Sequence, residues 1–191
     1  MRDGEHSRDR LLEAATAEFA AVGIAGARVD RIAEAASVNK AQMYRWYASK
    51  DDLFDAVFAQ HLDRIVDRVP LTPNDLPGYV VALYDSYLDA PELVRLASWF
   101  RLERAPTGDL LATHGDRWSY KLDLIAEAQA AGTIVTGITP ADVYALLISI
   151  AGTWSPISAT FTATEQESAA QHEARRAVLR GVVERALVGG G

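Results

Sequence analysis

The stretch VNKAQMYRWY, residues 38–47, combines large apolar and aromatic side chains with long polar ones within ten positions. Asn39 is a favourable N-cap, and if it opens a helix, Met43 and Tyr47 lie four residues apart on one face. The residues that then project from the opposite face are Lys40, Ala41, Tyr44 and Arg45. We therefore expect a short helix that is anchored on one side and exposed on the other. The alternative is an ordinary amphipathic helix of a helical bundle, with its aromatic rings half-buried.

The residues before this stretch complete a helix-turn-helix pattern. A first helix is expected over about 7–21 with Gly23 as its stop, a second over about 29–36, and Ser37-Val38 forms the turn. The helix after such a turn enters the major groove, where Arg and Lys bond guanine, Gln pairs with adenine and a small Ala admits a thymine methyl. Tyr44 and Lys50 are better placed for phosphates. The predicted DNA-binding residues are Arg28, Lys40, Ala41, Gln42, Tyr44, Arg45, Trp46 and Lys50.

The charge of the chain is unevenly distributed. The net charge of −7 argues against a nucleic-acid partner when it is taken alone. Residues 1–50, however, contain 8 Lys or Arg and 7 Asp or Glu, whereas residues 51–191 contain 11 and 19. An acidic body with one weakly basic end can approach a polyanion by a single face. Random surface charge is the competing explanation.

The rest of the chain is also expected to be helical, because apolar residues recur at helical spacing between regularly placed turn residues. Ser49 with Asp52 opens a fourth helix over about 50–68. Five further helices are expected over about 75–89, 91–105, 109–131, 140–155 and 165–188, the last two capped by Thr139 and Thr164. The predicted fold is all-α with about nine helices. An N-terminal three-helix domain, residues 1–50, is joined by the fourth helix to a C-terminal domain, residues 51–191.

The middle helices contain many aromatic residues, namely Tyr84, Tyr87, Trp99, Phe100, Trp118, Tyr120 and Tyr144. Aromatic side chains with a few polar atoms are typical of a cavity for a small, mostly apolar ligand. The predicted ligand-binding residues are Tyr84, Trp99, Tyr120 and Tyr144. Ordinary core packing is the alternative for each of them taken singly.

Patterns of catalysis and metal binding are missing from the sequence. Cysteine is absent, and the four histidines, His6, His61, His114 and His172, form no pair at metal-binding spacing. There is no glycine-rich phosphate loop or nucleophile elbow. We therefore expect no catalytic residue, no metal site and no cofactor. No signal peptide or membrane-spanning run is recognised, so we expect a cytoplasmic protein without a membrane partner.

Residues 10–58 resemble the DNA-binding domain of the tetracycline-repressor (TetR) family. The matching features are Leu12-Glu13-Ala14-Ala15, Phe19, Gly23, Val29, Ile32-Ala33, Met43-Tyr44, Tyr47, Ser49-Lys50 and Leu53. The chain departs from the family at three places. Arg28 stands where a capping Thr is common, Ser37 where the turn usually has Gly, and Asn39 where Ser is common. These departures affect which base pairs are read.

The resemblance implies a dimeric transcription regulator, usually a repressor, that reads a palindromic operator in double-stranded DNA. It also implies that a small-molecule effector binds the C-terminal domain and releases the DNA. The last two helices are the expected homodimer interface, with core packing as the alternative for their apolar residues. The predicted interface residues are Leu146, Leu147, Ile150, Trp154, Val178, Gly181, Val182 and Arg185. A ligand-independent regulator or an activator remains an alternative, and an all-helical enzyme is the least favoured.

Overall fold

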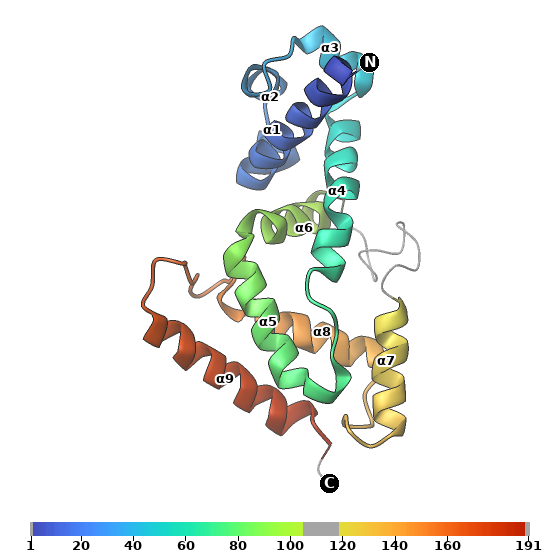
Figure 1. Cartoon of the computed structure of the whole chain (residues 1–191), viewed down its shortest axis with the longest axis vertical. Helices are drawn as coiled ribbons and strands as arrows, with labels where there is room; N and C mark the ends of the chain where they lie inside the picture. Colours follow the sequence, from blue (N-terminus) through green and yellow to red (C-terminus); the bar gives the residue numbers. More distant parts are fainter. Residues whose placement is uncertain (1, 105–118, 190–191) are drawn as a thin grey trace. The chain divides into compact units, whose positions relative to one another are not determined.

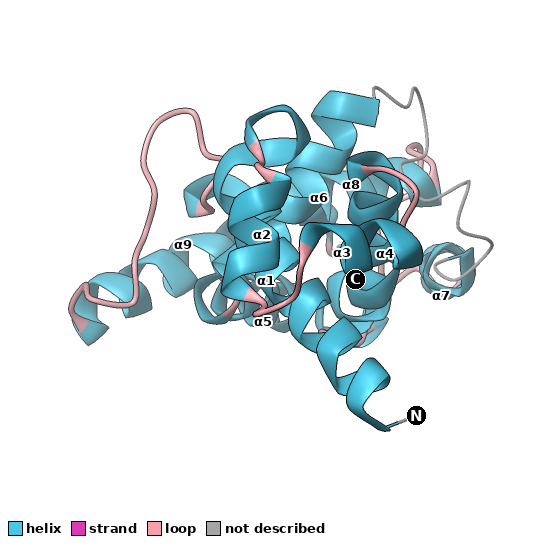
Figure 2. Cartoon of the chain, turned by 90° about the horizontal axis from the view of Figure 1, so that it is seen from above, coloured by secondary structure: helices cyan, strands magenta, loops and turns pink. Residues whose placement is uncertain are grey.

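The computed structural model describes residues 2–104 and 119–189, and the regular elements in these ranges are helices (Figures 1 and 2). The α-helices are α1 (Arg2–Gly26), α2 (Val29–Ala35), α3 (Lys40–Trp46), α4 (Lys50–Asp67), α5 (Leu76–Asp89), α6 (Pro91–Arg104), α7 (Ser119–Ala130), α8 (Pro140–Ala151) and α9 (Ala169–Leu187). Two short 3-10 helices are η1 (Pro73–Asp75) and η3 (Gly152–Trp154). One isolated antiparallel bridge joins Ile134 to Val188. The prediction of an all-α chain is confirmed, with nine α-helices in the described ranges.

Side-chain caps start several of these helices where the sequence predicted them. The Asn39 side chain accepts the Gln42 N–H at 2.7 Å, and the Ser49 hydroxyl accepts the Asp52 N–H at 3.0 Å. Thr139 likewise accepts the Asp142 N–H at the start of α8, at 3.1 Å. Each bond satisfies a backbone donor that has no partner inside its own helix.

Some helix limits differ from the predicted ones, and one predicted helix is only partly described. α9 begins at Ala169 because Ser168 and Gln171 form a reciprocal capping box, whereas the Thr164 N–H bonds the Glu167 carboxylate in a separate turn. Gly23 was expected to stop the first helix, and the regular helix is interrupted there by the positive φ of this residue, although another helical turn follows up to Gly26. Of the helix expected over 109–131, the part up to residue 118, including Trp118, lies outside the described residues.

The chain divides into two compact units that differ from the predicted split at residue 50. Among the described residues, the first unit comprises 2–65 and 92–104, and the second comprises 66–91 and 119–189. Helices α4 and α6 therefore pack with the helix-turn-helix. Buried phenylalanines join them: Phe19 of α1 meets Phe54 edge-on at 5.1 Å between ring centroids, and Phe58 stacks on Phe100 at 4.0 Å. Aromatic pairs of this kind add to the stabilisation from burial alone.

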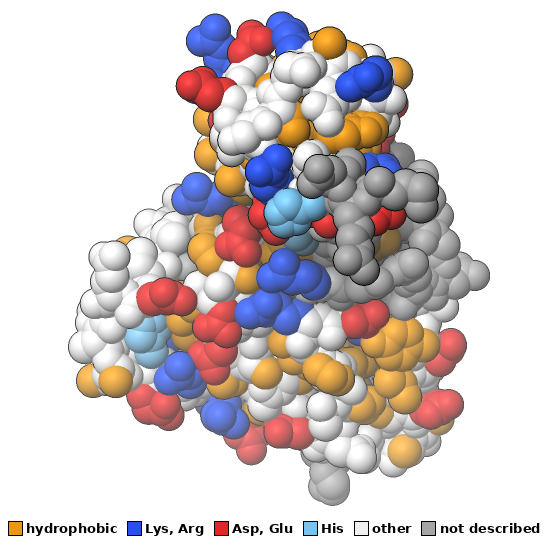
Figure 3. All heavy atoms as spheres, turned by 45° about the horizontal axis from the view of Figure 1, so that its top comes forward, with side chains coloured by type: hydrophobic (Ala, Val, Ile, Leu, Met, Phe, Trp, Pro, Cys, Tyr) orange, Lys and Arg blue, Asp and Glu red, His pale blue; other side chains and the backbone are white. Residues whose placement is uncertain are grey.

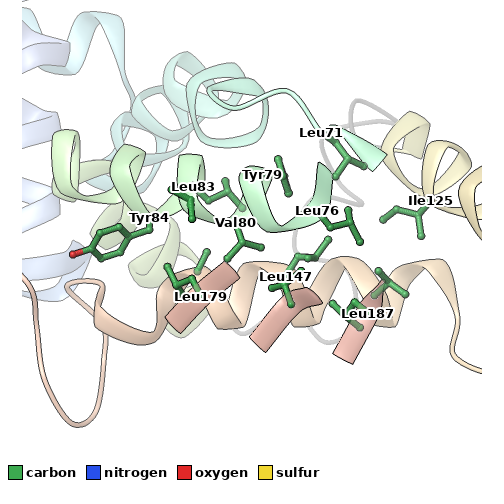
Figure 4. Packing of buried hydrophobic residues seen from close by; sticks show 14 of the residues in the cluster. Leu71, Leu76, Tyr79, Val80, Leu83, Tyr84, Ile125, Leu147, Leu179 and Leu187 are labelled. Carbon is green, nitrogen blue, oxygen red and sulfur yellow. The ribbon is translucent and has the colours of Figure 1, made fainter. Parts of the chain in front are cut away.

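The second unit is built around α5, which makes its most extensive contact with α9 and also packs on α8 (Figure 1). Its core contains Leu76, Val80, Leu83, Ile125, Leu147, Leu179, Val183 and Leu187. In Figure 4, Val80 and Leu83 of α5 lie near Leu147 of α8 and Leu179 of α9, whereas the Tyr84 hydroxyl points away from this group. Helical spacing of these residues places one apolar face of each helix in a shared core.

Gly23 is the sharpest backbone feature of the first unit. Its φ of 71° and ψ of −178° lie in a region that is essentially restricted to glycine. A Cβ at this position would lie 2.4 Å from Glu103 Oε1 and 2.9 Å from the Trp99 ring. Glycine therefore allows both the change of direction in α1 and the close approach of α6.

We predict that Gly23→Ala destabilises the chain more than Gly132→Ala does. Both glycines have positive φ, but a Cβ at Gly132 would meet nothing within 4 Å. The Gly132 variant should lose only the backbone contribution of about 1–2 kcal/mol, whereas the Gly23 variant adds a steric clash. Urea unfolding followed by circular dichroism measures both. Equal losses for the two variants would contradict the proposed close packing at Gly23.

Candidate nucleic-acid interface

Helix α3 is anchored to the first unit as the sequence predicted. Met43 is fully buried and Tyr47 is 6% exposed. Arg8 Nε of α1 donates to the Tyr47 hydroxyl at 2.9 Å, and its guanidinium lies 5.3 Å from the ring centroid. These contacts fix the helix about its long axis. Ser37, with a φ of 54°, lies in the left-handed region and forms the preceding turn, where the sequence predicted a turn.

The opposite side of α3 is open to solvent. Lys40, Ala41, Tyr44 and Arg45 are exposed, whereas Gln42 and Trp46 are half-buried. Lys40 Nζ lies 2.9 Å from Asp30 Oδ1 of α2, and both side chains are more than half exposed. An exposed pair of this kind contributes little and is screened by salt, so a phosphate can compete with Asp30 for the amine. Figure 3 shows Lys and Arg side chains interspersed with acidic ones over this unit, at the top of the view.

Lys50 has a structural partner that the sequence did not indicate. Its amine donates to the Ala27 carbonyl at 3.1 Å and lies 3.5 Å from the Ala25 carbonyl. These acceptors belong to the segment between α1 and α2, so Lys50 ties the start of α4 to the entry of the helix-turn-helix. Its contact with phosphate stays a prediction. For that contact, the amine would have to leave these carbonyls or donate to a phosphate and a carbonyl at the same time.

Glu18 organises the entry to α2. Its carboxylate accepts the Arg28 N–H at 2.9 Å and the Arg31 guanidinium at 2.6 Å. Burial would raise the pKa of Glu18, but the bonds from Arg28 and Arg31 lower this pKa below its ordinary value. The Arg28 side chain makes no cap bond and is exposed, as expected for arginine at this position. It is therefore accessible to a phosphate.

One acidic and one basic side chain near the end of α6 attach this helix to α1 and α4. Glu103 Oε1 accepts the Ile24 N–H at 2.7 Å, and Oε2 accepts the Ala25 N–H at 3.1 Å. Arg104 binds Asp51 at 2.6 Å and Asp55 at 2.7 Å on α4. Glu103 thus caps the turn that follows Gly23. Sequence reasoning missed this role, because partners 78 or 79 positions apart give no local signal.

The predicted ligand-binding residues do not form one group. Trp99 belongs to the first unit, where a Cβ at Gly23 would lie 2.9 Å from its ring, so its role in a ligand cavity stays a prediction. Phe100 also belongs to the first unit. Tyr84 is a buried core residue of the second unit, and its hydroxyl lies 2.7 Å from His172 Nδ1. Only Tyr120 and Tyr144 remain near a common centre.

That centre is Lys121, whose side chain is fully buried. Its amine lies 3.6 Å from Asp67 Oδ1 and within 6 Å of the Tyr120 and Tyr144 ring centroids. Tyr120 is exposed and donates to Asp67 at 2.7 Å. Burial and this bond raise the pKa of Tyr120 to about 12.

Tyr79 adds a buried hydroxyl beside this centre, next to Tyr144. The hydroxyl makes no hydrogen bond of good geometry to any described residue. Tyr144 is nevertheless close enough to raise the pKa of this hydroxyl. Burial, reinforced by Tyr144, raises the pKa of Tyr79 well above its ordinary value. A buried hydroxyl without a good partner costs free energy, which a bound acceptor could recover. Neither Lys121 nor Tyr79 was predicted, since a helix pattern does not distinguish them from surface and core residues.

The predicted dimer residues are divided between core and surface. Leu147 is fully buried in the core of its own unit, so its prediction as an interface residue is wrong. Ile150 and Trp154 are half-buried against that core. The residues that the structure leaves accessible are Leu146, Val178 and Val182, which are 44%, 53% and 37% exposed, with Gly181 partly exposed and Arg185 exposed.

Two family models match the chain. Residues 11–57 match bacterial regulatory proteins of the tetR family, and residues 75–185 match the tetracyclin repressor-like C-terminal domain. The second match alone covers more than half of the chain. The chain belongs to the tetracycline-repressor family.

Individual transcriptional regulators are similar to this chain over most of their length. The HTH-type transcriptional repressor SCO4008 of Streptomyces coelicolor is 36% identical over 158 residues, which is 82% of this chain and 81% of that protein. The repressor NicS of Pseudomonas putida is 24% identical, over 78% of this chain and 76% of that protein. The solved structure of the transcriptional regulator SCO4942 of Streptomyces coelicolor has 37% identity and a TM-score of 0.74, over 94% and 97% of the two chains.

This TetR-family chain is therefore a DNA-binding transcriptional regulator and not an enzyme. Its helix-turn-helix match coincides with α1 to α4, where α3 presents its exposed face. In the ranges that the structure describes, no helix is long and apolar enough to cross a membrane.

We predict that Asp30→Asn strengthens binding to duplex DNA at low salt. The substitution removes a carboxylate beside Lys40 and leaves the amine to a phosphate, so affinity should rise about threefold at about 50 mM salt and less at about 200 mM. Fluorescence anisotropy with a labelled duplex measures this change. Asp123→Asn, which alters an exposed carboxylate of the second unit, should leave affinity unchanged. Unchanged or weaker binding by Asp30→Asn would place Lys40 away from the DNA.

We predict a pH-dependent stability difference between the wild type and Lys121→Met. Burial lowers the pKa of Lys121 in the folded chain, although Asp67 opposes this effect. Between that lowered pKa and the ordinary value of 10.5, the unfolded chain binds more protons, so the stability contributed by Lys121 increases with pH. Urea unfolding at several pH values up to about 10 should show that the free energy of unfolding of the wild type increases relative to that of the variant as the pH rises. A difference that is constant or falls with pH would contradict the burial of the amine.

Proposed function

We propose that this TetR-family regulator is a homodimeric repressor that reads a palindromic operator and releases it when a small molecule binds the second unit. The observation that carries the proposal is the exposed face of α3, which is held outward by the burial of Met43 and Tyr47. The presence of Lys, Arg and Tyr on that face suits contacts with both phosphates and base edges. The regulator would act in the cytoplasm, where its operator is accessible.

The dimer is supported by the accessible apolar residues of α8 and α9. Leu146, Val178 and Val182 are exposed although each is large and apolar. A single short recognition helix makes few contacts, so two copies related by a two-fold axis would supply the affinity that one lacks. A two-fold dimer reads a sequence with the same symmetry, hence the proposed palindrome.

The effector site is proposed beside Lys121, Tyr79 and Tyr144. This group combines aromatic surface with a buried amine and buried hydroxyls, which is the composition expected around a mostly apolar ligand with one polar group. Binding can release DNA only if the ligand prefers a conformation in which the DNA-reading unit fits its operator poorly. No metal or other cofactor is proposed beyond this effector.

Selection of bound duplexes from a random pool by the full-length protein tests the proposal. We expect a palindromic consensus with two equal half-sites. Tyr44→Phe should weaken binding to all duplexes by a similar factor, because its hydroxyl is assigned to phosphate. Arg45→Ala should also change the preferred base at one position of each half-site, at a cost of about 1–3 kcal/mol.

A non-palindromic consensus would contradict the dimer, and identical consensus sequences for wild type and Arg45→Ala would contradict base reading by Arg45. A promoter reporter that carries the selected site tests the sign of regulation. Higher reporter expression with the regulator than without it would indicate an activator. If no compound in the cell extract dissociates the protein from the selected site, a ligand-independent regulator is favoured.

A further inference from the structure

The polar group around Lys121 is buried on one side and reaches solvent on the other. Lys121 on α7 and Tyr79 on α5 are 0% and 3% exposed, and Tyr144 on α8 is half-buried. Asp67, the last residue of α4, and Tyr120 are both exposed. A small molecule can therefore approach the amine of Lys121 by way of these two exposed side chains.

The carboxylate of Asp67 compensates the buried amine only in part. Asp67 Oδ1 lies 3.6 Å from the Lys121 amine, which is longer than the about 2.7–2.9 Å of a charge-assisted hydrogen bond. The same oxygen accepts the Tyr120 hydroxyl at 2.7 Å, and the Asp67 side chain is 43% exposed, so water also competes for it. Burial lowers the pKa of Lys121 by more than Asp67 raises it. An anion in closer contact would favour the protonated amine more strongly.

The tyrosine hydroxyls beside the amine are suited to donate to the same ligand group. Burial raises the pKa of Tyr79 and of Tyr144 above the ordinary value, so both phenols stay protonated at neutral pH. The Tyr79 hydroxyl is buried without a hydrogen bond of good geometry to a described residue. An acceptor atom that a ligand brought to this hydroxyl would remove the cost of leaving it unbonded.

We propose that the effector carries an anionic oxygen group, such as a carboxylate, which takes the place of Asp67 at the Lys121 amine and accepts from the Tyr79 hydroxyl. The inference rests on the proposed effector site and names the class of molecule that the site takes. A cationic group is disfavoured, because the protonated amine would repel it and because the Tyr120 and Tyr144 rings already lie within 6 Å of this amine. Displacement of Asp67 would also change the contacts at the end of α4, the helix that begins at Lys50.

NMR titration of the full-length protein with matched acids, amides and amines tests this inference. The probes are phenylacetate, phenylacetamide and phenethylamine, with octanoate, octanamide and octylamine as a second set of different shape. At least one acid should bind about tenfold more tightly than its amide and its amine, because it alone pairs with the buried amine. Lys121→Met should remove this preference. Asp67→Asn should strengthen binding of the acid about two- to fivefold, because asparagine still accepts from Tyr120 but no longer competes as an anion.

Asp123→Asn is the matched control, because Asp123 is an exposed carboxylate on the same helix as Lys121. This variant should bind every probe as the wild type does. Binding of neither acid, or a preference for the acid that persists in Lys121→Met, would overturn the inference. Circular dichroism shows whether Lys121→Met is folded. If it is not, Asp67→Asn decides, and unchanged or weaker binding of the acid by this variant overturns the inference.

Dissociation of DNA is measured separately, by fluorescence anisotropy of the selected duplex with the same probes. If an acid binds through Lys121 but leaves the duplex bound, the anionic class stands and the proposed release of DNA by a ligand fails. If an amide or an amine releases the duplex whereas neither acid binds, the proposed release stands and the anionic class is overturned.

Discussion

The burial of Met43 and Tyr47 against the first unit is the constraint on which the DNA-reading surface depends. A seven-residue helix has too few internal hydrogen bonds to be stable alone, so its position must come from packing. The two buried side chains lie four residues apart and set the rotation of α3 about its axis. Rotation by half a turn would bury Arg45 and expose Met43, at a large cost in desolvation. The same contacts that stabilise the unit therefore determine which side chains can meet a base pair.

A second theme is the use of polar and charged side chains to join separate helices. In the first unit, Glu103 and Arg104 bond backbone donors and carboxylates of other helices. In the second, Tyr84 bonds His172, and Lys121 lies between Asp67 and two aromatic rings. A buried ionised group is costly unless its surroundings compensate it, and partial compensation leaves room for a ligand to improve the balance.

Local features of this fold could be predicted from the sequence, whereas long-range pairings could not. The caps at Asn39, Ser49 and Thr139 and the strained turn at Ser37 each depend on neighbours a few positions away. Helix spacing also identified Met43 and Tyr47 as buried. In contrast, the attachment of α6 to the helix-turn-helix, which places Trp99 in the first unit, depends on residues about 80 positions apart. The same limit applies to Lys121, since a lysine in a helical pattern gives no sign that it is buried.

The bond from Glu103 to α1 affects whether the DNA-binding part of the chain can be exchanged as a separate segment. The first unit, which contains the helix-turn-helix, is assembled from two separate stretches of chain. The later stretch supplies both a cap for α1 and part of the phenylalanine core. A chimera that exchanged only the first sixty or so residues with a relative would pair a foreign α1 with the native α6. Transplanting DNA specificity between such regulators would thus require moving residues 92–104 along with the recognition helix.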